Sequence, residues 1–140
     1  MRLLLDTCVV SELRRTDGEP RVAAAVDALA ADAVYLSVIT LGELACGVAR
    51  MADGARKAAL GAWLAGLERD YADRILDIDA ETARLWGLMT ARAQAVGRTV
   101  GAADGLIAAS ARRHGLTVMT RNIRDFAPTG VDVVNPWPEP

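Results

Sequence analysis

Short apolar runs alternate along this chain with longer stretches of helical periodicity. Between the apolar runs, hydrophobic residues recur every three or four positions, which is typical of amphipathic helices. This alternation predicts an α/β protein of three layers, in which helices flank a central, mostly parallel sheet of about four to five short strands. The expected strands are residues 3–5, 34–38, 75–78, 116–119 and 131–134.

The expected helices follow from the same periodicity. We expect one to begin at Pro20, one at Thr40, and one to cover residues 55–69. A further helix begins after Asp79, which is a good N-cap, and ends at Gly97. The last covers about residues 101–114, so that helices separate most of the expected strands.

Nothing along the chain marks a domain boundary. The 140 residues are 52% hydrophobic and contain neither an internal repeat nor a low-complexity linker, so we expect a single domain over residues 1–140. No segment reaches the roughly 18 apolar residues of a membrane span. The N-terminal apolar run, residues 3–5, is too short for a signal peptide, and we expect a cytoplasmic protein.

Two long helices, expected within residues 55–96, carry apolar faces that fit two structural roles. Trp63 and Trp86 lie on these faces. Either the faces belong to the core of the domain, or they extend into a homodimer interface, where aromatic side chains are enriched.

The composition excludes several kinds of chemistry. Cys8 and Cys46 are the two cysteines and lack a C-x-x-C arrangement, which argues against a zinc site or a disulfide and favours small buried thiols. His114 is the single histidine and is expected at a helix C-terminus, so a Ser-His-Asp mechanism has little support. The net charge is −2, but all the basic residues except Lys57 are arginine, which suits phosphate contacts.

Four acidic residues interrupt their local patterns, beginning with Asp6 and Glu43. Asp6 follows the first strand, and the carboxyl ends of parallel strands are where ligands bind. Alternatively, Asp6 caps the next short helix through the amides around Cys8 and Val9. Glu43 matches a capping box with Thr40, yet helical geometry turns it about 150° from the apolar stripe of its own helix.

The other two acids, Asp104 and Asp125, lie in the C-terminal half. Asp104 has only apolar neighbours at i+3, i+4 and i+7 of its helix, which is unusual for a solvated carboxylate and favours a cation nearby. Asp125 follows the strand at 116–119, and its alternative is an ordinary loop aspartate paired with a neighbouring arginine.

Together the four acids predict a metal site. Two follow strands and two lie early in helices, which places them at one edge of the sheet. Carboxylates crowded there would repel one another unless a divalent cation offset their charge. Oxygen ligands without histidine or cysteine suit Mg²⁺ or Mn²⁺, and such sites commonly serve phosphoryl chemistry.

Several stretches resemble one family over nearly the whole chain. "LLLDTCVVSEL" is similar to the opening strand and first acid of PIN-domain ribonucleases, and "YLSVITLGELACGV" to their second motif. "AADGLIAASARRHGLTVMTRNIRDF" resembles the third and fourth motifs. "NPW" resembles the ending of the FitB-like subgroup of VapC-type toxins.

The resemblance implies a PIN-like fold and a role for each acid. Asp6, Glu43 and Asp104 would bind Mg²⁺ or Mn²⁺, and Asp125 would assist as a fourth catalytic acid. Thr7, Asn122 and Thr120 would be supporting side chains, and whether Asp125 or Asn122 is the fourth site residue stays open. Cys8 departs from the asparagine or serine that is frequent in the family, which weakens one polar contact near the metal.

The resemblance also implies a function and partners. It points to the toxic component of a type II toxin–antitoxin pair, a metal-dependent endoribonuclease that cleaves RNA through a metal-activated water. Arg121 and Arg124 would contact the RNA backbone, unless they are ordinary solvated arginines. The family usually forms homodimers and is inhibited by a small VapB-like antitoxin, whose C-terminal segment occupies the active-site groove and which makes most contacts with operator DNA.

Two other functions remain as alternatives. One is a catalytically weak PIN-fold binding module that acts mainly in a DNA-binding repressor complex with an antitoxin; the absence of an acid at position 122 leaves room for it. The other is a haloacid-dehalogenase phosphatase, which needs an aspartate where Cys8 stands.

Overall fold

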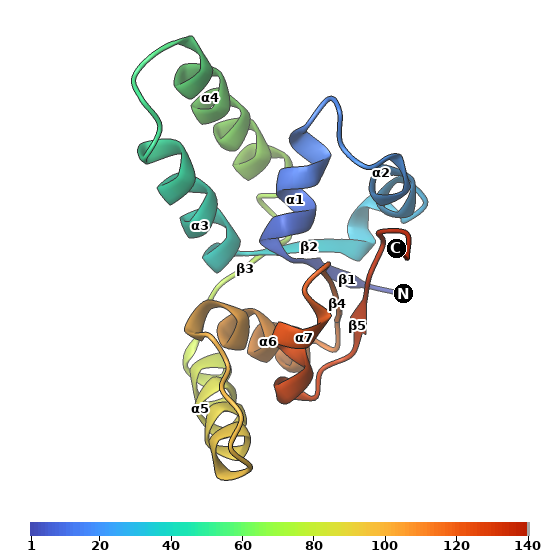
Figure 1. Cartoon of the computed structure of the whole chain (residues 1–140), viewed down its shortest axis with the longest axis vertical. Coiled ribbons are helices and arrows are strands. Elements are labelled where there is room, and N and C mark those ends of the chain that lie inside the picture. The colour runs from blue at the N-terminus through green and yellow to red at the C-terminus, as the bar shows by residue number, and fades with distance from the viewer. Residues whose placement is uncertain (140) are drawn as a thin grey trace.

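The computed structural model describes residues 1–139 as a five-stranded, wholly parallel sheet between two layers of helices (Figure 1). The strand order is β3–β2–β1–β4–β5, so the first strand of the chain is the central one. Leu3 pairs with Val34 of β2 on one side and with Thr117 of β4 on the other. The strands are β1 (Leu3–Leu5), β2 (Val34–Ser37), β3 (Ile75–Leu76), β4 (Thr117–Met119) and β5 (Val133–Val134).

Seven α-helices connect these strands within residues 1–139. In Figure 1, the two faces of the sheet carry different helices, with α1 to α4 above it and α5 to α7 below. The helices are α1 (Thr7–Arg14), α2 (Pro20–Asp27), α3 (Val38–Ala49), α4 (Ala55–Asp70), α5 (Ala80–Ala95), α6 (Ala102–His114) and α7 (Ile123–Phe126), with short 3₁₀ turns at Ala31–Ala33 and Ala127–Thr129.

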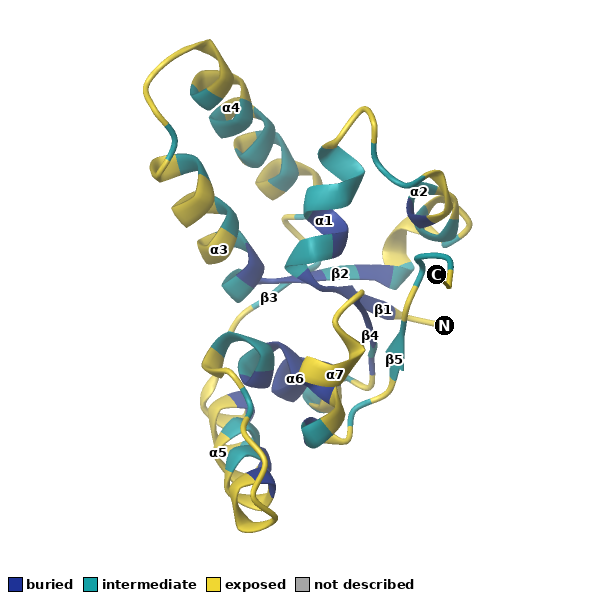
Figure 2. Cartoon of the chain, in the orientation of Figure 1, coloured by how far each residue is buried: buried dark blue, intermediate teal, exposed yellow. Residues whose placement is uncertain are grey.

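The core is divided by the sheet, because successive side chains of a strand point to opposite faces. Leu4 packs against the α6 side, together with Ile107 and Phe126. Leu3 and Leu5 pack against the α1 and α2 side. Figure 2 shows the result as dark-blue central strands, teal edge strands β3 and β5, a largely buried α6 beneath the sheet, and exposed outer helices. All three leucines of β1 are at most 2% exposed, as expected for a central parallel strand.

Several expected helix boundaries are confirmed. Asp79 caps α5, and its side chain accepts a hydrogen bond of 2.8 Å from the Thr82 N–H. α6 ends at His114, and Gly115 adopts the left-handed conformation that closes a helix there. The short helices α1 and α7 are additional to the helices whose bounds the periodicity predicts.

Other details of the prediction were wrong. The helical periodicity predicts that Val96 lies on the same apolar face as Trp86, but Val96 follows the end of α5 and is 72% exposed. The strand prediction at 34–38 is one residue too long, because Val38 begins α3. Cys46 was expected to be buried and is exposed, although both cysteines are free as predicted.

Trp63 and Trp86 are half-buried against the two core clusters, which confirms a core role for both. No helix within residues 1–139 is long and apolar enough to cross a bilayer.

Candidate metal centre

Asp6 is held in a fixed orientation at the carboxyl end of β1. Its Oδ1 accepts a hydrogen bond of 2.9 Å from the Thr7 N–H, so Asp6 caps α1 through Thr7 rather than through the following amides. Its Oδ2 accepts a 2.8 Å hydrogen bond from the Thr120 hydroxyl, which follows β4. Asp6 is only 4% exposed, and these donors stabilise its charged form. Capping and delivery to the sheet edge are therefore both true of Asp6.

Cys8 takes part in the same network. Its thiol lies 3.4 Å from Oδ2 of Asp6, to which it donates, and 3.7 Å from the Thr120 hydroxyl. Burial, and to a smaller extent the charge of Asp6, raise the pKa of the Cys8 thiol, so it remains a protonated donor at neutral pH. Cysteine therefore keeps a polar contact with Asp6 at this position, through the thiol as a weak donor.

Glu43 faces the site rather than the start of its own helix. The Thr7 hydroxyl donates a hydrogen bond of 2.7 Å to Oε1 of Glu43 and lies 3.1 Å from the Thr40 hydroxyl. The capping-box interpretation was wrong, because α3 begins three residues earlier and Ser37 caps it by accepting from the Ile39 N–H. Glu43 is exposed, as its position away from the apolar stripe predicts.

Asp104 completes the acidic cluster from the first turn of α6. Burial, followed in order of size by the charges of Asp6, Asp125 and Glu43, raises the pKa of Asp104 from 3.8 to about 6. The apolar neighbours predicted for it are fully buried: Ile107, Ala108 and Ala111. Asp104 itself is partly buried, so water solvates its charge less well than at an exposed site. The raised pKa therefore indicates that the other three carboxylates lie close enough to oppose the ionisation of Asp104.

The supporting polar residues differ in how they connect to this cluster. Thr120 is buried and also accepts a hydrogen bond of 2.9 Å from the Asn122 N–H. The Asn122 side chain is exposed and has no hydrogen bond within residues 1–139. Asp125 is exposed on α7 and forms no ion pair within the described chain, so the alternative of pairing with Arg121 or Arg124 was wrong.

The donor set suits a hard divalent cation. Across residues 1–139, no three histidine, cysteine, aspartate or glutamate side chains have the spacing of a formed metal site. Mg²⁺ commonly keeps several of its waters and binds through one or two carboxylates, so a formed three-carboxylate cage is not needed. The observation that fits a cation is the unbalanced charge around Asp104, whose ionisation three other carboxylates oppose.

A groove leads away from the acids between α1, α3 and α4. It has a volume of about 280 Å³ and is lined by both polar and apolar side chains. Its lining residues are Thr7, Ser11, Arg14, Glu43, Leu44, Gly47, Val48, Met51, Arg56 and Leu60.

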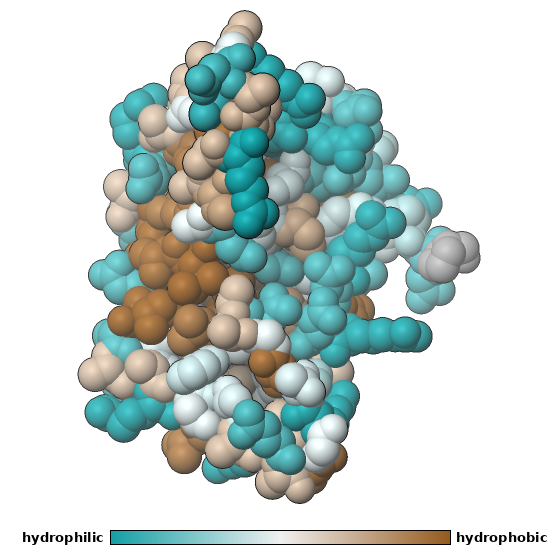
Figure 3. Space-filling model, turned by 60° about the vertical axis from the view of Figure 1, so that its left-hand side comes forward, coloured by the Kyte–Doolittle hydropathy of each residue, from teal (hydrophilic) through white to brown (hydrophobic). Residues whose placement is uncertain are grey.

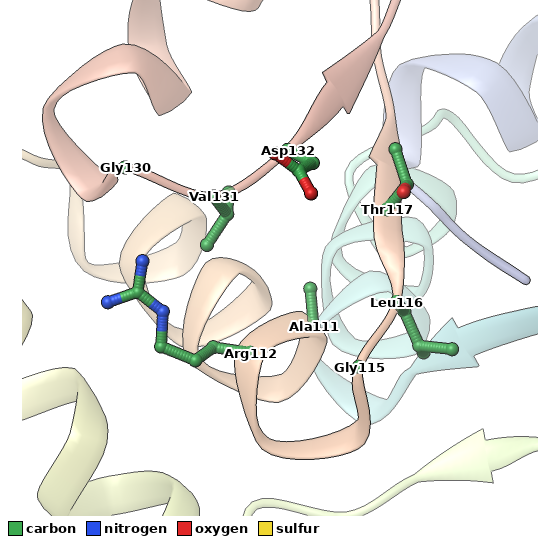
Figure 4. A pocket seen from close by; sticks show the side chains of 8 residues that line it. All are labelled: Ala111, Arg112, Gly115, Leu116, Thr117, Gly130, Val131 and Asp132. Carbon is green, nitrogen blue, oxygen red and sulfur yellow. The ribbon is translucent and has the colours of Figure 1, made fainter.

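A second hollow, about 230 Å³, lies at the opposite end of β4 from the acids (Figure 4). The Arg112 side chain there donates to the backbone carbonyl of Thr129 at 3.3 Å, and Gly130 closes the turn beside it. Asp132 is the one carboxylate of its lining, so the hollow brings together no group of catalytic side chains.

The fold and the site define an α/β protein whose carboxylates gather at the carboxyl edge of a parallel sheet, the place where open α/β folds bind their ligands. The chain belongs to the PIN domain family, which it matches over residues 3–130.

Its relatives and structural neighbours agree with this membership. The chain is 41% identical to Toxin FitB of Neisseria gonorrhoeae, over 96% of this chain and 98% of that protein. It is 38% identical to VapC ribonuclease Y4jK of Sinorhizobium fredii, over 96% of this chain and 97% of the relative. The structure of FitAB bound to an IR36 DNA fragment superposes with a TM-score of 0.91 at 38% identity, and the match covers 99% of this chain and 97% of that one.

Proposed function

We propose that this chain is the toxic component of a type II toxin–antitoxin pair, and that it acts in the cytoplasm as an endoribonuclease dependent on Mg²⁺ or Mn²⁺. The observation that carries the proposal is the gathering of Asp6, Glu43 and Asp125 around Asp104, whose pKa is raised to about 6 by burial and then by these three charges. Relatives that are named as a VapC ribonuclease and as Toxin FitB support it.

In this proposal, Asp6, Glu43 and Asp104 hold the metal. The cation would orient and activate water and offset the charge that builds on the scissile phosphate. Asp6 is ready for this role because three protein donors, the Thr7 N–H, the Thr120 hydroxyl and the Cys8 thiol, already fix its carboxylate. Thr7 positions Glu43 by hydrogen bonding, and Asp125 adds negative charge beside Asp104.

Two measurements test the metal-dependent activity. Calorimetry with Mn²⁺ on the purified protein should show saturable binding, and Asp104→Asn should remove it. Cleavage of a fluorophore-quencher RNA of mixed sequence should need Mg²⁺ or Mn²⁺ and should disappear in the same variant. Asp132→Asn, which changes an exposed carboxylate at the other end of β4, is the matched control.

The result that would count against the enzyme is equally definite. RNA cleavage that persists in Asp104→Asn at the wild-type rate would refute the assignment of this residue. If the wild-type protein neither binds Mn²⁺ nor cleaves RNA, the alternative of a catalytically weak binding module in a repressor complex is favoured.

The groove supports an antitoxin as the natural inhibitor. Its apolar lining suits side chains of an extended or helical segment, and its polar lining includes Glu43, where a basic side chain of the partner would be favoured. Gly47 lines the groove, and a Cβ built there meets no atom within 4 Å. Gly47→Trp should therefore weaken binding of a VapB-like antitoxin while Mn²⁺ binding persists. We assign contacts with operator DNA to that partner.

A homodimer is the expected oligomeric state. Figure 3 shows apolar side chains gathered in one patch on the face that comes forward from the α3, α4 and α5 side of Figure 1. A contiguous apolar patch of this kind, unlike a single exposed apolar residue, marks an interaction site on a protein surface. Light scattering after size-exclusion chromatography should give the mass of two chains, whereas the mass of one chain would refute the dimer.

A further inference from the structure

A third hollow adjoins the acidic cluster on the α7 side. It has a volume of about 380 Å³, within the range of pockets that bind small ligands. Asp125 belongs both to this hollow and to the field around Asp104, so the hollow lies directly beside the proposed metal centre. It is lined by Arg121, Asn122, Ile123, Arg124, Asp125 and Asn135.

Arg121 is placed at this hollow by an aromatic residue of the C-terminal segment. Its guanidinium lies 5.3 Å from the centroid of the Trp137 ring, a distance at which a cation and an aromatic face attract each other. Trp137 packs against the core cluster on the α1 and α2 side. Oδ1 of Asn135 accepts a hydrogen bond of 3.0 Å from the backbone N–H of Trp137, which holds the C-terminal segment in place.

The charge of Arg121 has no acidic partner in this arrangement. Neither Arg121 nor Arg124 forms an ion pair within residues 1–139, although Asp125 lines the same hollow. An arginine that is oriented by stacking and keeps its five donors available suits a phosphate group. The two arginines also offer a positive approach to a polyanion that the four carboxylates alone would repel.

The other lining residues suit a base. Within the described chain, the Asn122 carboxamide and the amide nitrogen of Asn135 have no protein partner, so each has hydrogen-bonding capacity left for a ligand. Ile123 is 40% exposed and supplies an apolar contact for a ring face. Proteins recognise single-stranded RNA by this combination of cation, carboxamide and apolar surface.

We propose that this hollow is a nucleotide subsite, which holds the nucleotide next to the scissile phosphate of a single-stranded RNA. Arg121, oriented by Trp137, binds its phosphate, and Asn122 and Asn135 read the edge of its base. The inference rests on the proposed ribonuclease function and adds to it the residues that set the cleavage preference.

The first test measures binding without cleavage. Titration of the ¹⁵N-labelled protein with AMP, CMP, GMP and UMP in EDTA should shift the indole N–H signal of Trp137 and the carboxamide signals of Asn122 and Asn135. The indole signals of Trp63 and Trp86 are internal controls. Inorganic phosphate should shift the Trp137 signal but leave the two carboxamides in place. Unchanged Trp137 and carboxamide signals with all four nucleotides would overturn the subsite.

The second test measures the cleavage preference on a randomised RNA pool, with the products sequenced. Asn135→Asp keeps the oxygen that accepts from the backbone N–H of Trp137 but removes the side-chain NH₂ donor. It should therefore change the base preferred beside the cleavage site. Arg121→Lys keeps the charge but not the planar stack, and should raise KM about tenfold while kcat changes much less. Arg21→Ala removes an exposed arginine of α2 and should have no effect on either quantity.

The two proposals fail differently in these tests. Nucleotide-induced shifts without any RNA cleavage would support the subsite and count against the nuclease. RNA cleavage whose base preference and KM are unchanged in both variants would overturn the subsite and leave the nuclease standing.

Discussion

The raised pKa of Asp104 predicts that this residue destabilises the metal-free protein. Its pKa rises from 3.8 to about 6 on folding, mainly through burial and the charge of Asp6. Because the folded state holds the proton more tightly, ionisation of Asp104 above pH 6 disfavours folding. Asp104→Asn removes that charge and should stabilise the protein at pH 7.5 in EDTA.

The magnitude follows from the same shift. A difference of about two pH units corresponds to at most about 3 kcal/mol, and partial exposure of the carboxylate reduces it to about 1 to 2 kcal/mol. For a chain of this size, that gain raises the melting temperature by roughly 3 to 8 °C. The gain should shrink as the pH falls through 6 and vanish below about 4, where Asp104 is protonated in both folded and unfolded states.

Adding the metal should reverse the order of stability. Mn²⁺ at a hundred times its dissociation constant stabilises the wild-type protein by about 2.7 kcal/mol, whereas the Asp104→Asn variant gains little. The Asp104→Asn variant should therefore melt at the higher temperature in EDTA, and the wild-type protein at the higher temperature in Mn²⁺. Because protons compete for Asp104, Mn²⁺ affinity should also fall between pH 7 and pH 5.

One result would refute this reasoning. If Asp104→Asn melts below the wild-type protein in EDTA at pH 7.5, the carboxylate is not under the repulsion described. Asp132→Asn serves as the control and should change the stability by less than about 0.5 kcal/mol, because its carboxylate is exposed.

Three further predictions concern packing, buried polarity and metal binding. Thr120→Val removes the hydroxyl that donates to the buried carboxylate after β1, and should cost about 1 to 3 kcal/mol in urea unfolding. Thr117→Val, a half-buried site on the same strand, should change little. The Thr120 variant should also bind Mn²⁺ more weakly by calorimetry, since the carboxylate is no longer oriented. Gly105→Ala places a Cβ 2.9 Å from the Trp86 ring and should cost about 1 to 3 kcal/mol of stability. Gly87→Ala is the control, because its Cβ meets no atom within 4 Å and should stabilise the helix. Thermal melts compare the two variants.

The sequence predicts the acids of the site well because each one breaks a local pattern. Asp6 interrupts a buried strand, and Asp104 lies among residues that are fully buried in the structure. Both are visible within a few positions of the chain. The parallel sheet was predicted for the same reason, since apolar runs and helical periodicity are local properties.

The partners of these acids were harder to predict, because they come from distant segments. Thr120 donates to a carboxylate 114 positions earlier, and nothing around it marks that hydroxyl as different from any other threonine. The stacking of Arg121 on Trp137 depends on how the C-terminal segment returns over the sheet. Thr40 shows the opposite error. Its local motif predicted a capping box with Glu43, but the helix begins earlier and Ser37 caps it.

The central place of β1 has a consequence for synthesis of the chain. The first strand to leave the ribosome cannot find both neighbours until β4, near the other end of the chain, has also emerged. Asp6 gains its Thr120 partner at the same moment. The proposed nuclease centre would therefore stay unassembled on the nascent chain for nearly the whole duration of translation.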